Sequence, residues 1–298
     1  MNTREQGFLL LTSHLGDPQR KVLTVAQLRN LSLRVQGDDR PQQDGELAPS
    51  DLIRLGYEQE TAHRIISLLS QQEQLDWYLQ KAKKAGCAPI SRISDDYPVA
   101  LQKKLGLDCP GTLWAKGNLE LLNKPAVSLV GSRNLGKENR NFAQEAGRQA
   151  AKQGFVLISG NAVGADQTAQ NACLQAGGDV ISIVADCLAD HQESEHILYL
   201  SEDGFDMPFT PLRALSRNRL IHAMGGFTMV AQCSYEKGGT WDGTKTNLRK
   251  KYSPVFCFQD HSQAVCALTD MGAVPITTEA LADFSLLQPA CSSFLDSI

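Results

Sequence analysis

The stretch "VSLVGSRNLG", Val127 to Gly136, has the form of a buried strand that ends in an anion-binding turn. Apolar residues lead into Gly131, which has no Cβ and so lets backbone N–H groups come close to an anion. Ser132 can donate a hydrogen bond, and Arg133 can hold a phosphate through two of them. The helix expected after the turn would add its positive dipole end. The spacing fits neither the dinucleotide-binding fingerprint nor the P-loop, so we expect a phosphate site of another kind.

The alternation of apolar strand, polar turn and helix continues from about residue 125 to 260. It predicts strands at 126–130, 155–159, 180–185, 227–233 and 254–258, and helices at 137–153, 166–176, 212–224 and 244–251. Continuous apolar strands that alternate with helices are typical of an α/β fold: a Rossmann-like, mostly parallel sheet with helices on both faces. Ligands of such sheets bind at the carboxyl ends of the strands.

The remaining segments predict smaller parts around this domain. We expect a small helical N-terminal domain at 1–88, a connector packed on the core at 89–124, the Rossmann-like domain at 125–260 and a C-terminal extension at 261–298. Residues 50–86 have apolar side chains at helical spacing, with Ser50 as a candidate N-cap and Gly86 as a stop. Residues 35–49 are polar and rich in turn formers, which predicts a loop. The extension predicts helices at 262–272 and 278–287, with a short strand at 273–277 between them.

Composition restricts the class of protein. The 298 residues are 42% hydrophobic and 21% charged, which is ordinary for a globular chain. No apolar run approaches the ~20 residues of a membrane span, and the first apolar run is too short for a signal peptide. We therefore expect a cytoplasmic protein without membrane contact. The eight cysteines have no C-x-x-C spacing or partner histidine, so we expect small buried side chains rather than disulfides or metal ligands.

Charge is unevenly distributed along the chain. The net charge of −4 argues against a protein covered in positive charge. Residues 186–206 hold seven acidic residues and no Lys or Arg, whereas 208–252 hold eight Lys or Arg against two acidic residues. The pattern is compatible with a local basic surface, or simply with solvated helix faces.

Two further strand ends carry polar residues that should meet at the edge of the sheet where Gly131 lies. The loop "SGNAVGAD" (159–166) is flexible and rich in hydrogen-bond donors, and Asp166 is expected as the N-cap of the next helix. Its candidate ligand-binding residues are Ser159, Gly160, Asn161 and Gly164. The stretch "LSRNRLIHAMGG" supplies Arg217, Asn218 and Arg219. Arginines at i and i+2 do not share a helix face, so we expect one of them in the cleft and the other on a domain or dimer surface.

A third glycine-rich stretch, "YEKGGTWDGTKTNLRKK" (235–251), is expected to be a loop that opens onto a helix N-terminus. Its candidate ligand-binding residues are Gly238, Gly239, Thr240, Thr244 and Lys245. Three such loops on one sheet edge, each with a cation or a hydroxyl, predict a cleft for a polyanion or a nucleotide. We expect no metal and no cofactor.

Five segments between Tyr97 and Phe258 together resemble the DprA/Smf family of DNA-processing proteins, whose domain is related to that of the cytokinin-activating phosphoribohydrolases. The segments are "YPVALQKK" (97–104), "CPGTLWAKGN" (109–118), "VSLVGSR" (127–133), the run 154–188 around "SGNAVGAD", and "LSRNRLIHAMGGFTMVAQC" (215–233). The chain departs from the family at Ala165 and Gln170, where Ile and His are usual, and in a longer last loop.

The resemblance implies a protein that binds single-stranded DNA, works as a homodimer and helps to load a RecA-type recombinase in transformation or recombination. It implies DNA contacts at Ser132, Arg133, Arg217, Asn218 and Arg219, whereas Lys245 is a candidate on physical grounds alone. No catalytic residues are implied.

Two other functions stay open on the residues alone. The stretch "GGTWDGT" also resembles the phosphoribohydrolase loop, but Asn247 stands where those enzymes have a catalytic Glu, and an amide cannot take up a proton as a carboxylate does. A sensor that holds a small nucleotide-derived ligand in the same cleft would fit the acidic net charge and the longer loop. A pure interaction scaffold leaves the three glycine-rich loops unexplained.

Overall fold

The computed structural model describes residues 1–38 and 47–287. These residues form two compact units, Met1–Ala115 with Ser201–Met207, and Lys116–Leu200 with the chain from Pro208 onward. The predicted loop at 35–49 and the end of the predicted extension lie partly outside the described residues. The predicted domain boundaries at 88, 124 and 260 stay a prediction.

The first unit is mainly helical. Its elements are α1 (Thr3–Thr12), α2 (Val25–Gln36), α3 (Pro49–Arg54), α4 (Gln59–Leu69), α5 (Gln72–Lys84), β1 (Cys87–Ser91), α6 (Val99–Leu105) and a 3₁₀ turn, η1 (Gly106–Asp108), while β2 (Thr112–Gly117) crosses into the second unit. Leucines of α1, α2 and α3 pack on Ile65 of α4 in one apolar core. Ser50 is not an N-cap: Ala48 takes that position and Pro49 is the first helical residue. The helical segment breaks near Gly56, whose φ of +83° suits glycine.

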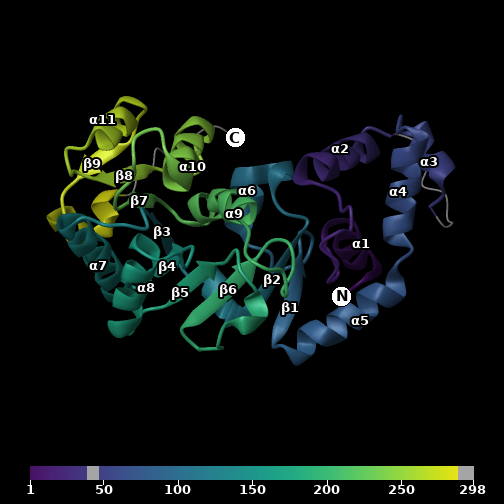
Figure 1. The fold of residues 1–298 in the computed structure, drawn as a ribbon, viewed down its shortest axis with the longest axis horizontal. Helices are drawn as coiled ribbons and strands as arrows, with labels where there is room; N and C mark the ends of the chain where they lie inside the picture. Colours follow the sequence, from purple (N-terminus) through teal and green to yellow (C-terminus); the bar gives the residue numbers. More distant parts are fainter. Residues whose placement is uncertain (39–46, 288–298) are drawn as a thin grey trace, which may run out of the picture. The chain divides into compact units, whose positions relative to one another are not determined.

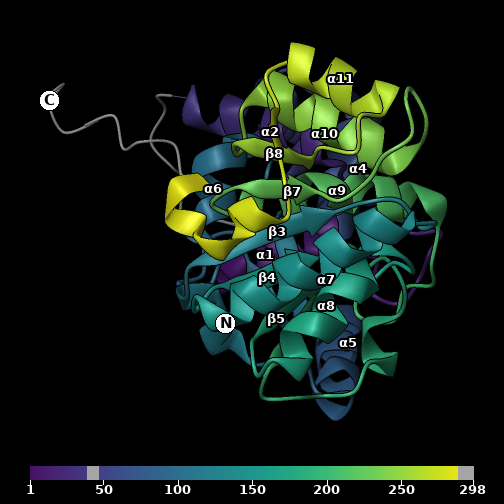
Figure 2. The ribbon, with the colours of Figure 1, turned by 90° about the vertical axis from the view of Figure 1, so that its left-hand side faces the viewer.

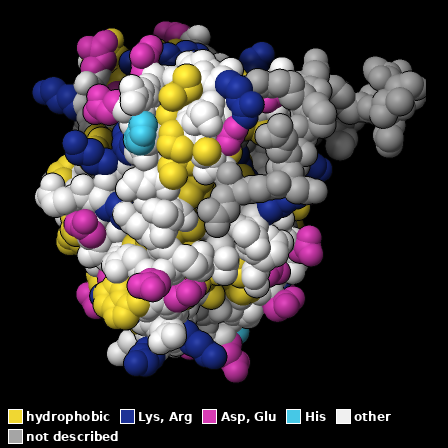
Figure 3. Space-filling model, turned by 90° about the vertical axis from the view of Figure 1, so that its right-hand side faces the viewer, with side chains coloured by type: hydrophobic (Ala, Val, Ile, Leu, Met, Phe, Trp, Pro, Cys, Tyr) yellow, Lys and Arg dark blue, Asp and Glu magenta, His cyan; other side chains and the backbone are white. Residues whose placement is uncertain are grey.

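One face of the first unit carries charges of both signs. Seen from the side of α3 and α4, hydrophobic side chains lie among Lys, Arg, Asp and Glu rather than beside a continuous basic surface (Figure 3). Exposed apolar side chains of this unit include Ile53 and Trp77. Single exposed apolar residues of this kind are ordinary on protein surfaces.

The second unit is built on seven parallel strands, which confirms the predicted Rossmann-like α/β class (Figure 1). They are β3 (Ala126–Val130), β4 (Val156–Ser159), β5 (Val180–Ile183), β6 (Ile197–Ser201), β7 (Thr228–Val230), β8 (Val255–Phe258) and β9 (Val274–Ile276). Their order is β6-β5-β4-β3-β7-β8-β9, with Ser128 of β3 in register with Ile158 and Thr228. The chain moves outward in one direction from β3 to β6 and returns on the other side of β3 with β7. The gap between β3 and β7 is thus the topological switch point, where ligands of such sheets bind.

The helices of this unit are α7 (Lys137–Lys152), α8 (Ala165–Gln175), α9 (Pro211–Met224), α10 (Gly238–Lys250) and α11 (Gln263–Asp270), with 3₁₀ turns η2 (Leu119–Asn123), η3 (Leu188–Asp190), η4 (Glu279–Ala282) and η5 (Phe284–Leu287). Helices α7 and α8 lie side by side, as do α9 and α10 (Figure 2). Side chains along β3 point alternately to the two faces of the sheet, so one face packs on α7 and α8 and the other on α9. Val127 and Leu129 join the apolar core of α7 and α8, whereas the Ser128 hydroxyl donates to the Ile221 carbonyl of α9 at 2.5 Å.

Four predictions about local structure need correction or qualification. Strand β6 was missed, because its short apolar run lies inside the acidic segment. Helix α10 begins at Gly238, six residues before the predicted start, since the glycine-rich stretch forms its first turns. The predicted last helix is two 3₁₀ turns, interrupted at Asp283, whose backbone is extended. None of the seven cysteines within the described residues forms a disulfide, and five are buried as predicted, but Cys266 is exposed and Cys187 only partly buried.

Candidate functional site

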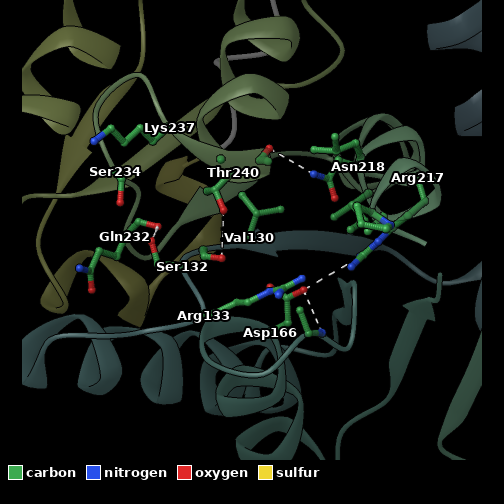
Figure 4. A pocket seen from close by; sticks show the side chains of 18 of the residues that line it. Val130, Ser132, Arg133, Asp166, Arg217, Asn218, Gln232, Ser234, Lys237 and Thr240 are labelled. Atoms are coloured by element: carbon green, nitrogen blue, oxygen red, sulfur yellow. Dashed lines mark hydrogen bonds and ion pairs between the residues drawn. The ribbon is translucent and has the colours of Figure 1, made fainter. Parts of the chain in front are cut away.

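A cavity of about 620 Å³ opens at the switch point, lined by residues from the carboxyl ends of β3 and β7, the loop before α8, one side of α9 and the start of α10 (Figure 4). Eight of the predicted site residues line it: Gly131, Ser132, Arg133, Arg217, Asn218, Gly238, Gly239 and Thr240. The sheet topology therefore brings together side chains that are up to 109 residues apart in the sequence, as in the 3.0 Å hydrogen bond from the Thr240 hydroxyl to the Gly131 carbonyl.

Arg217 is the most unusual residue of the cavity. It lies in the middle of α9 with only 7% of its surface exposed, and its Nε and Nη1 atoms have no hydrogen-bond partner among the described residues. Its charge is balanced by Asp166, whose carboxylate lies 4.0 Å away (Figure 4). Burial lowers the pKa of the Arg217 guanidinium, Asp166 opposes that shift, and the positive charge of Arg133 adds to it. A buried guanidinium with open donor positions is a strong site for an anionic acceptor.

Asp166 holds the loop before α8 rather than capping the helix. The predicted N-cap role is wrong, because Gly164 is the N-cap and Asp166 lies in the first turn. Its carboxylate instead accepts hydrogen bonds from the backbone N–H of Gly160 at 3.1 Å and of Ala162 at 3.4 Å. Complete burial raises the pKa of this carboxyl, and Arg217 and the two N–H groups counteract that shift. Asp166 is thus a structural partner of Arg217 within the cavity wall.

Two glycines of the same loop are required by space and by backbone conformation. A Cβ on Gly160 would overlap the Arg217 guanidinium, so this glycine provides the seat for that side chain. Gly164 has a φ of +99°, and a Cβ there would overlap the carbonyl oxygens of Ser132 and Arg133. The loop therefore fits closely against both Arg217 and the Gly-Ser-Arg turn, although neither glycine lines the cavity.

The Gly-Ser-Arg turn is organised differently from the expectation. The backbone N–H and the hydroxyl of Ser132 both donate to the Gln232 carbonyl, at 2.9 and 3.2 Å, so neither is free for an anion. A Cβ on Gly131 would overlap the Ala165 side chain, which explains the glycine by helix packing. The N–H of Gly136, at the start of α7, donates to the Gln232 side chain. From this turn, the free group is the exposed side chain of Arg133.

The helix N-terminus at the cavity belongs to α10. Its N-cap, Lys237, makes no side-chain capping hydrogen bond, and both Lys237 and the first residues of the helix line the cavity. Asn218 of α9 ties this helix start in place, donating to the Gly239 carbonyl at 3.1 Å. The positive end of the α10 dipole and the Lys237 ammonium thus add to the two arginines. All of these groups favour a negatively charged ligand.

The other predicted site residues lie outside the cavity. Ser159 is fully buried and donates to the Leu129 carbonyl at 2.9 Å, and the Asn161 carbonyl accepts from Gln167 within the loop. Arg219 donates to the Ser216 carbonyl of its own helix and does not line the cavity, and its placement on a domain or dimer surface stays a prediction. Lys245 is exposed and Thr244 is buried, both inside α10 and beyond the lining residues. Gly160 and Gly164 do not line the cavity and contribute only by allowing their loop to pack closely against Arg217 and the Gly-Ser-Arg turn.

A buried polar cluster lies between α9 and α10. His222 Nδ1 is 3.1 Å from the Asn247 amide nitrogen, and the Asn247 carbonyl oxygen accepts from the Ser253 N–H at 2.9 Å. Complete burial lowers the pKa of His222 to about 4, so its ring is neutral at physiological pH. The Asn247 amide is therefore a structural group that joins α10 to α9. Asn247 itself does not line the cavity, and its side chain is fully buried beside the neutral His222 ring.

Several lining residues were not predicted from the sequence. Lys237 and Ser234 come from the turn before α10, Gln232 from the end of β7, and Ile221 and Leu215 form an apolar wall on α9. Lys237 could have been found, since it directly precedes the glycine pair of a helix start. The apolar wall carries no distinguishing sequence signal. Among the described residues, no cluster of His, Cys, Asp and Glu could hold a metal ion, and no helix is both long and apolar enough to cross a bilayer.

Comparisons with known proteins agree on one family. The family described as DNA recombination-mediator protein A matches residues 89–280, more than half of the chain. The chain is 31% identical over 160 residues to the DNA processing protein DprA of Streptococcus pneumoniae, covering 50% of this chain and 55% of that protein. It is 32% identical over 164 residues to DprA of Bacillus subtilis, covering 51% and 53%. The chain therefore spans about half the length of the curated relatives it matches.

Two solved structures share the fold. The S. pneumoniae DprA structure has a TM-score of 0.72 and 23% identity, covering 97% of this chain and 99% of that one. A DNA processing protein A of Helicobacter pylori, described for its single-stranded DNA binding mode, has a TM-score of 0.55 and 21% identity, covering 68% and 97%. On the strength of the match over residues 89–280, this chain belongs to the DNA recombination-mediator protein A family, the DprA/Smf proteins.

Proposed function

We propose that the cavity between β3 and β7 binds single-stranded DNA through its phosphates and does not cleave it. The observation that carries this proposal is Arg217, a buried guanidinium with two atoms lacking hydrogen-bond partners, in a cavity that also holds Arg133. An anionic oxygen at this position would supply the missing acceptors, each worth about 1.5–3 kcal/mol when the partner is charged. Family membership and the DNA-binding description of the H. pylori relative support DNA as the source of that anion.

Binding without chemistry fits the titratable groups of the cavity. Its only carboxylate among the described lining residues, Asp166, is held by two backbone N–H groups and by Arg217. His222 also lines the cavity, but burial lowers its pKa to about 4 and its Nδ1 is 3.1 Å from the Asn247 amide nitrogen. Hydrolysis of a glycosidic or phosphodiester bond requires a placed general acid or base, or a metal ion. Asn247, at the position of the phosphoribohydrolase Glu, is buried in the cluster with His222 and Ser253 and does not line the cavity. We infer that the chain acts as a binding protein rather than as an enzyme.

A free nucleotide-derived ligand is the second candidate, and the volume of the cavity favours it. At about 620 Å³ the cavity is far larger than one phosphate needs and falls in the range of small-molecule sites. The two candidates differ in the effect of salt. A strand that contacts several phosphates loses affinity steeply as salt rises, with a slope near −0.7 per phosphate, whereas a small ligand with one phosphate shows a shallow slope.

The biological setting is proposed from the family alone. We propose that the chain works in the cytoplasm as a homodimer and assists a RecA-type recombinase in transformation or recombination. Membership of a family of DNA recombination mediators supports this setting. Size-exclusion chromatography with light scattering tests the homodimer when the chain is run alone, and tests the recombinase contact when a recombinase of this type is added.

The test of the proposed function compares two arginines of the same unit. Arg133 lines the cavity, whereas Arg140 is exposed on α7 and does not line it. We expect Arg133→Ala to weaken binding of fluorescein-labelled oligo-dT by roughly 1–3 kcal/mol in fluorescence anisotropy, while Arg140→Ala binds as the wild type does. Equal affinities of the wild type and Arg133→Ala would refute the assignment of DNA to this cavity.

A further inference from the structure

Exposed hydrophobic and aromatic side chains flank the cavity on two sides. Next to α9 they are Phe209, Leu212 and Leu215, with 52%, 76% and 50% of their surfaces exposed. Next to α10, Tyr235 is 37% exposed. The two groups adjoin opposite walls, because Ser234 and Lys237 lie across the cavity from Arg217 and Asn218 (Figure 4). Exposed apolar groups beside a cationic cavity indicate a ligand that has both negative charge and apolar faces.

Both groups are attached to ordered backbone. Tyr235 lies in the turn Ser234–Lys237, closed by the Lys237 N–H donating to the Ser234 carbonyl at 3.3 Å, and both ends of this turn line the cavity. Its ring contacts the buried Trp241 edge to face, with the centroids 5.2 Å apart. A ring held in this way loses little freedom on binding, which favours its use as a stacking surface.

Phe209 directly precedes the N-cap of α9, Thr210, and Leu212 is the second residue of the helix. The Thr210 hydroxyl caps the helix, accepting from the Arg213 N–H at 3.1 Å, and Leu215 one turn later lines the cavity. The Arg213 guanidinium fixes the same segment, donating to the carbonyls of Pro208 and Ala185 at 2.7 Å. Of the apolar strip formed by Phe209, Leu212 and Leu215, Leu215 belongs to the apolar wall of the cavity.

We propose that Phe209 and Tyr235 stack the bases on either side of the nucleotide whose phosphate meets Arg133 and Arg217, so that the binding site extends beyond the cavity in both directions along the strand. Single-stranded DNA brings anionic groups to the cavity and flat apolar faces to both flanks. Aromatic stacking of this kind tolerates any base sequence, since every base has a π-face. The inference rests on the proposed function and adds the residues that contact the bases.

The test measures binding of two labelled oligonucleotides of equal length and charge, oligo-dT and a strand made entirely of abasic sites. We expect Phe209→Ala and Tyr235→Ala each to weaken oligo-dT binding by roughly 5- to 150-fold, the range for a lost base–aromatic stack. Because no phosphate contact is lost, the slope of log K for oligo-dT against log salt concentration should equal that of the wild type. The abasic strand should bind equally to the wild type and to both variants. Phe209→Tyr, which keeps a ring, should retain wild-type binding.

Leu286→Ala is the matched control, since Leu286 is 79% exposed on the same unit but does not line the cavity. Wild-type oligo-dT affinity in Phe209→Ala and Tyr235→Ala, or an equal loss on the abasic strand, would overturn the stacking inference while leaving the proposed function standing. A protein mass that falls in the variants without DNA, measured by light scattering, would also overturn it, because the strip would then be a contact between copies of this chain. Failure of the wild type to bind either strand at low salt would refute both.

Discussion

Gly160→Ala is a substitution of one methyl group that should remove Arg217 from the cavity without altering any cationic residue. A Cβ on Gly160 would overlap the Arg217 guanidinium, and the overlap involves both its carbon and its nitrogen atoms. The φ of Gly160 is not positive, so alanine is compatible with the backbone itself. The side chain that must move is therefore Arg217, since the Gly160 N–H is tied to Asp166.

The expected size of the effect follows from the contacts of the guanidinium. Displaced from its seat, Arg217 loses its position 4.0 Å from Asp166 and presents no ordered donors to a phosphate. The loss of one charge-assisted hydrogen bond costs about 1.5–3 kcal/mol, or roughly 10- to 150-fold in affinity for oligo-dT. The free energy of unfolding should change little, by about 1 kcal/mol, because steric strain is offset by release of a buried guanidinium that lacks partners.

A double-mutant cycle separates this mechanism from general damage. In Arg217→Met the guanidinium is absent, so adding Gly160→Ala should cost little further affinity, and the two losses should be far from additive. Gly226→Ala is the matched control, because its Cβ would meet only the Ala126 carbonyl oxygen, at an ordinary 3.4 Å. The assay is fluorescence anisotropy with labelled oligo-dT, with urea unfolding as the measure of stability. Wild-type affinity in Gly160→Ala, or additive losses in the cycle, would refute the seating of Arg217 on Gly160.

Two further predictions concern the buried cluster of His222, Asn247 and Ser253, of which His222 also lines the cavity. The pKa of His222 is lowered to about 4 in the folded chain, whereas a histidine of the unfolded chain has a pKa near 6.5. As pH falls, the unfolded chain therefore takes up the proton first. The stability contributed by neutral His222 is present above pH 6.5 and is lost as pH falls toward 4. Between pH 7.5 and 4 the wild type should therefore lose about 3 kcal/mol more unfolding free energy than His222→Gln in urea titrations, and equal losses would show that the ring is not buried in its neutral form. Asn247→Glu should lower the unfolding free energy by about 3 kcal/mol, since it places a carboxylate in a closed site beside His222, and should yield no ribosyl hydrolysis of AMP. Measurable turnover in Asn247→Glu would restore the phosphoribohydrolase reading.

The fold was predictable because its strands carry simple signals. Continuous apolar runs such as β3 and β8 can be buried only in a sheet covered on both faces, and the turns between strands and helices are marked by glycine. Strand β6 was not predictable in the same way, since its pairing with β5 is a long-range contact and its own flanks are acidic. The start of α10 was misplaced because glycines, which disfavour helices locally, are accepted there where Asn218 and Leu215 approach closely.

The candidate site was predictable in its location and only partly in its chemistry. The i and i+2 spacing of Arg217 and Arg219 correctly assigned one of them to the cleft. The pattern "GSR" suggested a backbone cradle, yet the Gln232 carbonyl takes both Ser132 donors, and that contact joins residues 100 positions apart. Likewise, the role of Gly160 as the seat of Arg217 depends on tertiary packing, which leaves no local trace in the sequence.

The most direct test of the central claim is the affinity for labelled oligo-dT across a salt series, measured for the wild type and for the Arg133→Ala/Arg217→Ala double variant. If the cavity binds a strand, the wild type should bind tightly at low salt, with log K falling by ~0.7 per phosphate contacted, and the double variant should lose most of the affinity together with part of the slope. Absence of binding by the wild type at low salt, or binding that the double variant retains in full, would contradict the assignment of single-stranded DNA to this cavity.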